Sequence, residues 1–168
     1  MNDIREVLGE TLLFRYLDDE RRDKILSLGE VRSLGEGELV IHEGEVSPYV
    51  YAVLDGEVSV GVTKEGGKNV YICTIGRGEI FGEAGIFMKT PRTANVMSLG
   101  ESRVFQLHRK ALLEFIKDEP SAGIKILMIV VYGLLKKLRE SNQELAFERK
   151  SDVEQADIDV LVESLMKD

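Results

Sequence analysis

Residues 81–94 read FGEAGIFMKTPRTA, a stretch that holds two glycines, one acid and one arginine. Glu83 precedes Arg92 by nine residues. Because apolar segments flank the stretch on both sides, we expect these two charged side chains to lie close to the core. A charge there is costly unless it is paired or bound to a ligand. The stretch therefore predicts a site where both charges have a partner.

The residue types of this stretch suit a ligand that carries both hydroxyl groups and a phosphate. Gly82 and Gly85 lack a Cβ atom and let the backbone approach a ligand closely. One helical turn at 83–88 would offer backbone N–H groups to an anion, and Arg92 would add a forked, permanently charged donor. Glu83 can accept hydrogen bonds from hydroxyl groups. The spacing alone leaves two interpretations open: a sugar-phosphate pocket, or a Glu83–Arg92 ion pair without a ligand.

This stretch resembles the phosphate-binding cassette of the cyclic nucleotide-binding domain family. That family includes the bacterial catabolite activator protein, the regulatory subunits of cyclic-AMP-dependent protein kinase and the cyclic-nucleotide-gated channels. The residues at the family's spacing are Gly82, Glu83, Ala84, Gly85, Ile86, Arg92, Thr93 and Ala94. Residues 44–58, GEVSPYVYAVLDGEV, are a second recognisable stretch, which we interpret as strands and turns rather than ligand contacts. The resemblance extends over residues 10–147, most of the chain.

The resemblance implies a mainly β fold: an eight-stranded β-roll of the jelly-roll type, with N-terminal helices and a long C-terminal dimerisation helix. The residue pattern agrees, because short β-rich runs alternate with glycine turns throughout the predicted roll. We expect strands at 39–42, 49–54, 57–62, 69–75, 93–99 and 102–107.

The expected domain covers residues 1–147 and is followed by a charged, acidic tail at 148–168. Within the domain, the predicted parts are N-terminal helices at 2–28, the roll at 31–107 and helices at 109–147. Asp18 or Asp19 is expected to cap a helix that ends near Leu28, because acids are favoured at the start of a helix.

By the same resemblance, we expect a non-catalytic receptor for a cyclic nucleotide, cyclic AMP first and cyclic GMP second. The implied ligand-binding residues are Gly82, Glu83, Ala84, Gly85, Arg92, Thr93 and Ala94. Glu83 and the Gly82 backbone would hold the ribose 2′-hydroxyl, and Arg92 with the amides near Ala84 and Thr93 would hold the cyclic phosphate. Thr93 leaves the base undecided: a hydroxyl there accompanies cyclic GMP in eukaryotic members and cyclic AMP in bacterial activators.

The long helix is predicted at 121–147 and has apolar residues on more than one face. One series has the 4-3-4-3-4 spacing of a coiled-coil seam: Leu127, Val131, Leu134, Leu138, Ser141 and Leu145. We expect a parallel homodimer through 121–147; the alternative is a helix that covers only its own domain. By the resemblance, this helix also caps the purine, and the candidate residues are Leu134, Lys137, Leu138 and Ser141.

Composition narrows the classes of partner. The net charge of −8 disfavours contact with nucleic acid and with anionic membranes. Residues 148–168 are too few for a helix-turn-helix domain, so direct DNA binding is not expected. The longest apolar run, 126–135, is too short to span a bilayer. The single cysteine, Cys73, fits a small buried hydrophobe, and one cysteine without a signal peptide favours the cytoplasm.

No arrangement of catalytic residues is recognised, so an enzyme is not expected. The two histidines, His42 and His108, lie far apart in sequence, and no metal site or cofactor is expected either. The alternative to a receptor is a protein-interaction or dimerisation module whose β-roll no longer binds ligand and which docks through 121–168. The presence of both Glu83 and Arg92 favours the receptor. We expect the receptor to act on a downstream protein partner, which the sequence does not identify.

Overall fold

The computed structural model describes the backbone of residues 2–64 and 66–165, and the side chains of 4–64, 66–139 and 141–143. Contacts divide the chain into two units, Met1–Ile129 and Val130–Asp168, and each is described by itself. The first unit contains all the described strands and every cassette residue named above.

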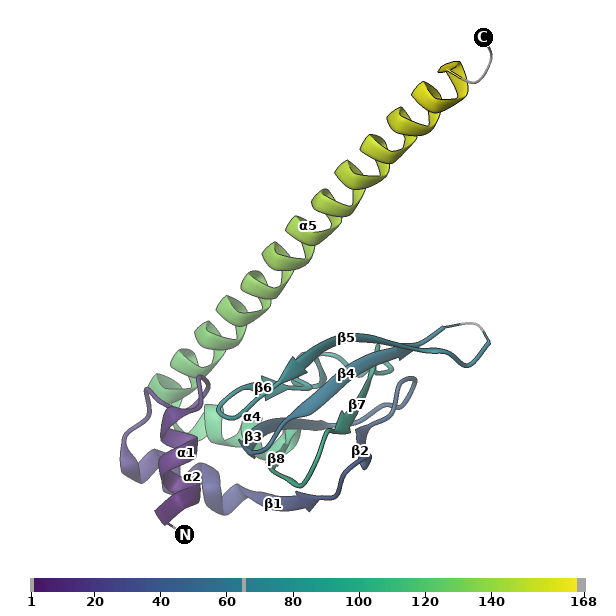
Figure 1. Ribbon diagram of the computed structural model, residues 1–168. Helices are drawn as coiled ribbons and strands as arrows, with labels where there is room; N and C mark the ends of the chain where they lie inside the picture. The colour runs from purple at the N-terminus through teal and green to yellow at the C-terminus, as the bar shows by residue number, and fades with distance from the viewer. Residues whose placement is uncertain (1, 65, 166–168) are drawn as a thin grey trace. The chain divides into compact units, whose positions relative to one another are not determined.

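The N-terminal segment forms two helices, α1 (Asn2–Glu10) and α2 (Asp19–Leu28), which lie at one end of the sheets (Figure 1). The Asp18 side chain caps α2 and accepts a hydrogen bond from the Arg21 amide at 3.0 Å, which confirms the first of the two predicted caps. Between the helices, the buried ring of Phe14 packs edge-to-face on Phe105 at 6.3 Å.

Eight strands occur within the described residues, in two antiparallel sheets rather than a closed barrel (Figure 1). One sheet has the order β1-β8-β3-β6 and the other β2-β7-β4-β5. The bounds are β1 Gly29–Leu34, β2 Leu39–Ile41, β3 Tyr49–Asp55, β4 Val58–Thr63, β5 Asn69–Ile75, β6 Ile80–Phe81, β7 Asn95–Ser98 and β8 Ser102–His108. The predicted mainly β, eight-stranded fold with flanking helices is therefore confirmed.

The core of the first unit contains buried residues from both sheets, so it lies between them. Its members are Leu34, Val40, Ile41, Tyr51, Val53, Val58, Phe81, Val96 and Val104. Tyr51 of β3 stacks on Phe81 of β6, with ring centroids 4.9 Å apart and planes 8° apart. This stack joins the strand before the cassette to the interior of the roll.

The prediction that Cys73 is buried was wrong. Cys73 lies exposed on β5, which within the described residues is an edge strand with β4 as its one neighbour. An edge strand leaves more of its surface to solvent than a central strand does, so a β-rich run does not by itself imply burial.

The remaining helices are α3 (Ala84–Phe87), α4 (Arg109–Asp118) and α5 (Pro120–Leu165). Helix α5 continues well past residue 147, where the sequence predicted the start of a tail. No glycine or proline follows Gly133, so nothing in the chemistry of the later residues stops the helix. The side chains of the predicted seam residue Leu145 and of the tail lie outside the described residues.

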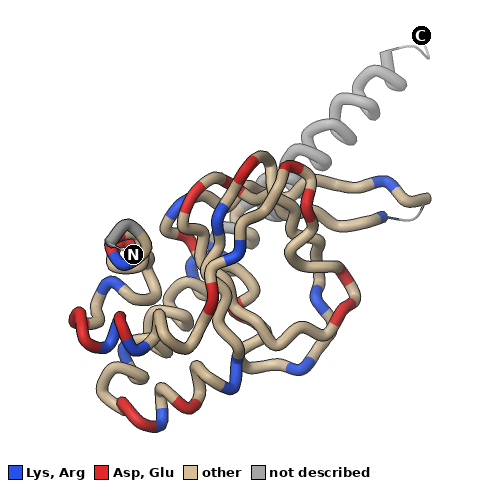
Figure 2. Tube along the Cα trace, turned by 90° about the horizontal axis from the view of Figure 1, so that it is seen from below, with Lys and Arg blue, Asp and Glu red and all other residues tan. Residues whose placement is uncertain are grey.

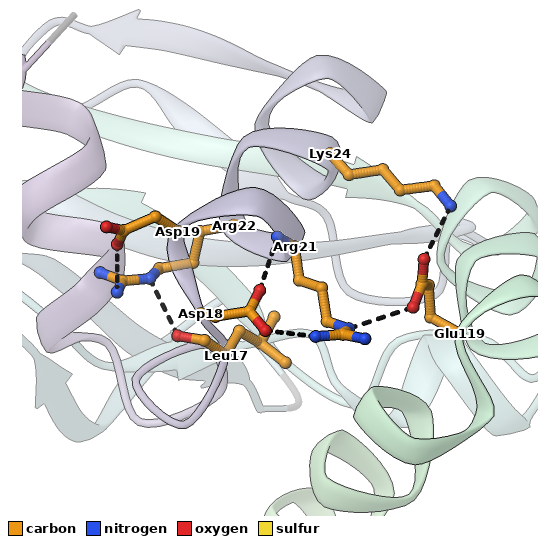
Figure 3. A network of polar contacts seen from close by, with 7 residues as sticks. All are labelled: Leu17, Asp18, Asp19, Arg21, Arg22, Lys24 and Glu119. Atoms are coloured by element: carbon orange, nitrogen blue, oxygen red, sulfur yellow. Dashed lines mark hydrogen bonds and ion pairs between the residues drawn. The ribbon is translucent and has the colours of Figure 1, made fainter.

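A polar cluster joins α2 to the corner between α4 and α5 (Figure 3). Glu119 at this corner accepts hydrogen bonds from Arg21 Nε at 3.0 Å and from Lys24 Nζ at 3.3 Å. Arg21 also pairs with Asp18, the residue that caps α2. The hydrogen bond from Arg21, and after it that from Lys24, holds the pKa of the Glu119 carboxyl below its usual value. The cluster therefore favours the ionised carboxylate at neutral pH.

Acidic and basic residues are interspersed along the described chain (Figure 2). Among the described residues, no helix is long and apolar enough to cross a membrane. The same residues contain no group of three or more His, Cys, Asp or Glu side chains that could hold a metal ion.

Candidate functional site

The cassette begins with a tight turn followed by the one-turn helix α3. Gly82 has φ = +73°, a backbone conformation that side chains with a Cβ atom rarely adopt. The amide of Gly85 donates to the Gly82 carbonyl at 3.0 Å, and the amide of Ile86 donates to the Glu83 carbonyl at 3.1 Å. Glu83 occupies the N-cap position of α3. The helical turn predicted at 83–88 is thus present at Ala84–Phe87.

Glu83 and Arg92 are both buried, as the sequence predicted, and each is only 9% exposed. Burial lowers the pKa of the Arg92 guanidinium, while the nearby Tyr51 and Glu83 act in the opposite direction. The acid and the base therefore lie within each other's electrostatic field, on the same side of the molecule. An arginine remains a cation at neutral pH in such a setting.

The guanidinium of Arg92 is held by main-chain oxygen atoms. Nη1 donates to the carbonyl of Gly82 at 2.9 Å, and Nη2 donates to the carbonyls of Ser47 at 2.9 Å and Tyr49 at 2.5 Å. We call these three oxygens the carbonyl cradle. Among the described residues, the buried Nε of Arg92 has no hydrogen-bond partner. Three of the five N–H groups are thus used: one binds Gly82 within the cassette, and two join the cassette to Ser47 and to Tyr49, the first residue of β3.

The main chain of Arg92 is fixed to the same segment. Its amide donates to the Glu45 carbonyl at 2.8 Å, and its carbonyl accepts from the Gly44 amide at 2.8 Å. Backbone and side chain of Arg92 therefore both bind the loop that leads into β3. The 44–58 stretch, which the sequence presented only as strands and turns, contributes directly to the geometry of the cassette.

Gly85 leaves room for the guanidinium. A Cβ atom at this position would lie 2.7 Å from Nη2 and 2.9 Å from Nη1 of Arg92. Both distances are shorter than real Cβ contacts allow. The absence of a side chain at Gly85 therefore serves the packing of Arg92 in this structure, in addition to any approach of a ligand.

The other predicted ligand-binding residues lie on the same stretch, with different exposures. Ala84 and Thr93 are exposed, and Ala94 is half-buried. The candidates for the purine cap, Leu134, Lys137, Leu138 and Ser141, are exposed on α5 in the second unit. The fold thus brings the cassette residues together within the first unit.

Sequence reasoning missed the roles of Ser47 and Tyr49. Both contribute through a backbone carbonyl, which every residue possesses, so their side chains carry no signal for this contact. The only indirect sign is that the 44–58 stretch and the cassette are the two most recognisable parts of the chain.

A family model described as "Cyclic nucleotide-binding domain" matches residues 31–119, more than half of the chain. The chain belongs to the cyclic nucleotide-binding domain family. Residues 31–119 include the cassette, the carbonyl cradle and the whole of α4. The family resemblance inferred from the cassette is confirmed.

Two curated relatives of this chain come from two different kinds of regulatory protein. The chain is 30% identical over 118 residues to a cAMP-dependent protein kinase regulatory subunit of Blastocladiella emersonii, covering 70% of this chain and 29% of that protein. It is 31% identical over 141 residues to a CRP-like cAMP-activated global transcriptional regulator of Mycobacterium tuberculosis, covering 84% of this chain and 61% of that protein. The chain thus spans less than two thirds of either relative.

Solved structures share the fold. The Thermus thermophilus catabolite activator protein superposes with a TM-score of 0.72 at 26% identity, covering 82% of this chain and 62% of that one. A cyclic nucleotide-binding domain from Methylobacillus flagellatus superposes with a TM-score of 0.73 at 25% identity, covering 83% of this chain and 79% of that one. Most of this chain therefore shares its fold with these two solved structures.

Proposed function

We propose that this protein is a non-catalytic receptor for a cyclic nucleotide, with cyclic AMP as the preferred ligand and cyclic GMP as the second candidate. The observation that carries the proposal is the burial of one acid, Glu83, and one base, Arg92, in a single cassette. Two buried charges are tolerated when each has a partner of suitable chemistry. Two relatives are named as cAMP-dependent and cAMP-activated proteins, and this supports the same ligand.

In the proposed binding mode, the ribose and the phosphate of the ligand bind to different residues of the cassette. The Glu83 carboxylate and the Gly82 backbone hold the ribose 2′-hydroxyl, because an ionised carboxylate only accepts hydrogen bonds. Arg92 and the amides near Ala84 and Thr93 hold the cyclic phosphate. Gly85 and Ala94 complete the cassette wall, and the purine is capped from α5.

The carbonyl cradle restricts how Arg92 can meet a phosphate. Both N–H groups of Nη2 are used by Ser47 and Tyr49, and Nε is shielded from solvent. One N–H of Nη1 remains for a phosphate oxygen. A two-pronged contact would therefore require the guanidinium to release a carbonyl, which would alter the loop before β3. The ligand can shift this equilibrium only by its difference in affinity for the two arrangements.

We further propose that the receptor is a parallel homodimer formed through α5. Within the first unit, Ile124 and Met128 of α5 are 59% and 68% exposed. The series continues at 3–4 spacing through Val131, Leu135 and Leu138, all more than half exposed. Apolar residues at this spacing form coiled-coil seams. We prefer this line to the series that begins at Leu127, because Leu127 is partly covered within its own unit.

The test of the receptor is calorimetric titration with cyclic AMP and cyclic GMP. A charge-assisted hydrogen bond is worth about 1.5–3 kcal/mol, so Arg92→Ala should weaken binding by roughly tenfold to a hundredfold. Arg77→Ala is the matched control, because Arg77 is half exposed and pairs with Glu10 away from the cassette. Unchanged affinity in Arg92→Ala would contradict the role assigned to the arginine.

One observation favours the second candidate, an interaction module that no longer binds ligand. The carbonyl cradle already provides partners for the Arg92 guanidinium, so a buried arginine does not by itself require a phosphate. A thermal-shift panel of cyclic nucleotides separates the two functions. Ligand that binds the folded state raises Tm. No shift with any cyclic nucleotide would favour the interaction module.

A further inference from the structure

His108 lies at the junction between β8 and α4 and caps the helix. Its Nδ1 accepts a hydrogen bond from the Lys110 amide at 3.0 Å, which satisfies one of the free N–H groups at the start of α4. An imidazole nitrogen accepts a hydrogen bond only when it carries no proton. The observed cap therefore requires the neutral ring with its proton on Nε2.

The His108 ring also contacts the strand that supplies the carbonyl cradle. It packs edge-to-face on the Tyr49 ring, with centroids 5.2 Å apart. The next residue, Arg109, donates its amide to the Pro48 carbonyl at 2.7 Å. The Tyr49 carbonyl in turn accepts from Arg92. A continuous series of contacts thus runs from the start of α4 through residues 48–49 to the cassette arginine.

The described charged groups that follow the ring in the first turn of α4 are cations. Tyr49 faces it from β3, Arg109 and Lys110 follow it in α4, and the first turn of α4 contains no acid. Glu114 lies one turn later and pairs with Lys110 at 3.9 Å. A ring that carries a proton on Nδ1 could not accept the hydrogen bond from the Lys110 amide that caps the helix.

We propose that His108 is a positioning residue that makes the carbonyl cradle of Arg92 sensitive to pH. The neutral ring caps α4 and supports Tyr49; protonation removes the cap, loosens the start of α4 and weakens the support of residues 48–49. Histidine is the side chain whose ordinary titration falls between about pH 5 and 8. The effect on nucleotide affinity rests on the proposed function, whereas the cap and its link to Arg92 do not.

Amide hydrogen exchange followed by NMR tests both parts without a ligand. In the wild type, the protection of the Lys110 amide, corrected for the intrinsic exchange rate, should fall about fivefold from pH 8 to pH 5, the usual worth of a cap. The Arg92 amide, bonded to the Glu45 carbonyl, should lose protection over the same pH range. His108→Asn should keep both amides protected at both pH values, because an amide oxygen caps a helix without titrating.

Two further variants make the outcome decisive. His108→Ala should show low protection of Lys110 at both pH values, and His42→Asn should follow the wild type, because His42 lies exposed after β2. Parallel pH profiles in the wild type and His108→Asn would overturn the proposal. A change at Lys110 without one at Arg92 would overturn the link to the cradle. If cyclic AMP binds, its affinity should fall from pH 8 to pH 5 by a factor that is two- to fivefold larger in the wild type than in His108→Asn. The upper limit is about fivefold, because the cap contributes no more than that.

Discussion

The geometry of the cassette depends on residues outside it, because Arg92 binds to them. Its guanidinium contacts three carbonyl oxygens, and two of them belong to Ser47, just before β3, and to Tyr49, the first residue of β3. A buried guanidinium is costly unless its N–H groups are satisfied. The arginine therefore organises the loop around the site and, in the proposed function, also meets the phosphate.

Gly85→Ala should destabilise the protein, because the new methyl group would meet the guanidinium of Arg92 at less than 3 Å from both Nη atoms. Arg92 cannot move aside without losing carbonyl partners. We expect a loss of about 1–3 kcal/mol in the free energy of unfolding, as for overpacked sites. Urea denaturation measures this loss.

The matched control for that substitution is Gly35→Ala, because no atom lies within 4 Å of the Cβ position at Gly35. Its effect should stay within about 0.5 kcal/mol, as for surface changes. Equal stability of the two variants would show that the close fit between Gly85 and Arg92 is not required for folding.

At the residue scale, the sequence predicted that Glu83 and Arg92 are buried, but it did not predict the hydrogen-bond partners of Arg92. Glu83 and Arg92 could be placed in the core because apolar segments flank them, and both are buried. The partners of Arg92 could not be predicted, because a carbonyl oxygen belongs to every residue and only the chain's path decides which ones converge. The prediction that Cys73 is buried was wrong for a related reason, because residue type does not reveal which strand lies at the edge of a sheet.

At the scale of elements, the corner between α4 and α5 is fixed from two sides. Glu119 is bonded to Arg21 and Lys24 of α2. A Cβ atom at Gly123 would lie 2.6 Å from Ile116 Cγ2, so α5 crosses α4 at very short range. The polar cluster at Glu119 and the close contact at Gly123 therefore both hold this corner.

Glu119→Gln should lower the stability of this corner at neutral pH, because the charged partner of Arg21 and Lys24 is lost. The folded state holds the pKa of Glu119 below its usual value, so the carboxylate stabilises the fold above that usual value. This contribution disappears as pH falls through the lowered pKa. The Tm of the wild type and of Glu119→Gln should therefore differ at pH 7 and converge well below about pH 4, near the ordinary glutamate value.

Glu114→Gln is the control for this pH series, because Glu114 makes a long, exposed pair with Lys110 in the preceding turn of α4. Its Tm should follow the wild type throughout. A difference for Glu119→Gln that persisted unchanged into the acid range would rule out the charge as its cause.

The sequence predicted most elements but not every boundary. The alternation of β-rich runs and glycine turns located six of the eight strands in the described residues. It missed β1, whose Glu30, Arg32 and Ser33 hide the pattern, and β6, which has two residues. The end of α5 was placed too early, because a change from apolar to charged residues ends a buried face but does not end a helix.

At the scale of the whole molecule, the proposed dimer predicts a sedimentation mass of twice the 18.8 kDa chain. Leu135→Asp would place a carboxylate in the proposed seam, where an unpaired charge is costly. We expect the dimer Kd to rise more than about tenfold, which is about 1.4 kcal/mol. Analytical ultracentrifugation over a concentration series measures this shift.

Leu113→Asp is the control for the seam, because Leu113 is a 40% exposed leucine on α4 rather than α5. It should leave the dimer Kd unchanged. Leu134→Asp tests the other series, which begins at Leu127. A stronger effect from Leu134 than from Leu135 would assign the seam to that series.

The most direct test compares cyclic AMP with its 2′-deoxy analogue by calorimetry, in the wild type and in Glu83→Ala. If the buried carboxylate holds the ribose hydroxyl, the wild type should bind the analogue roughly tenfold to a hundredfold more weakly, the worth of a hydrogen bond to a charged group. Glu83→Ala should bind the two ligands about equally. Equal binding of both ligands by the wild type would contradict the account.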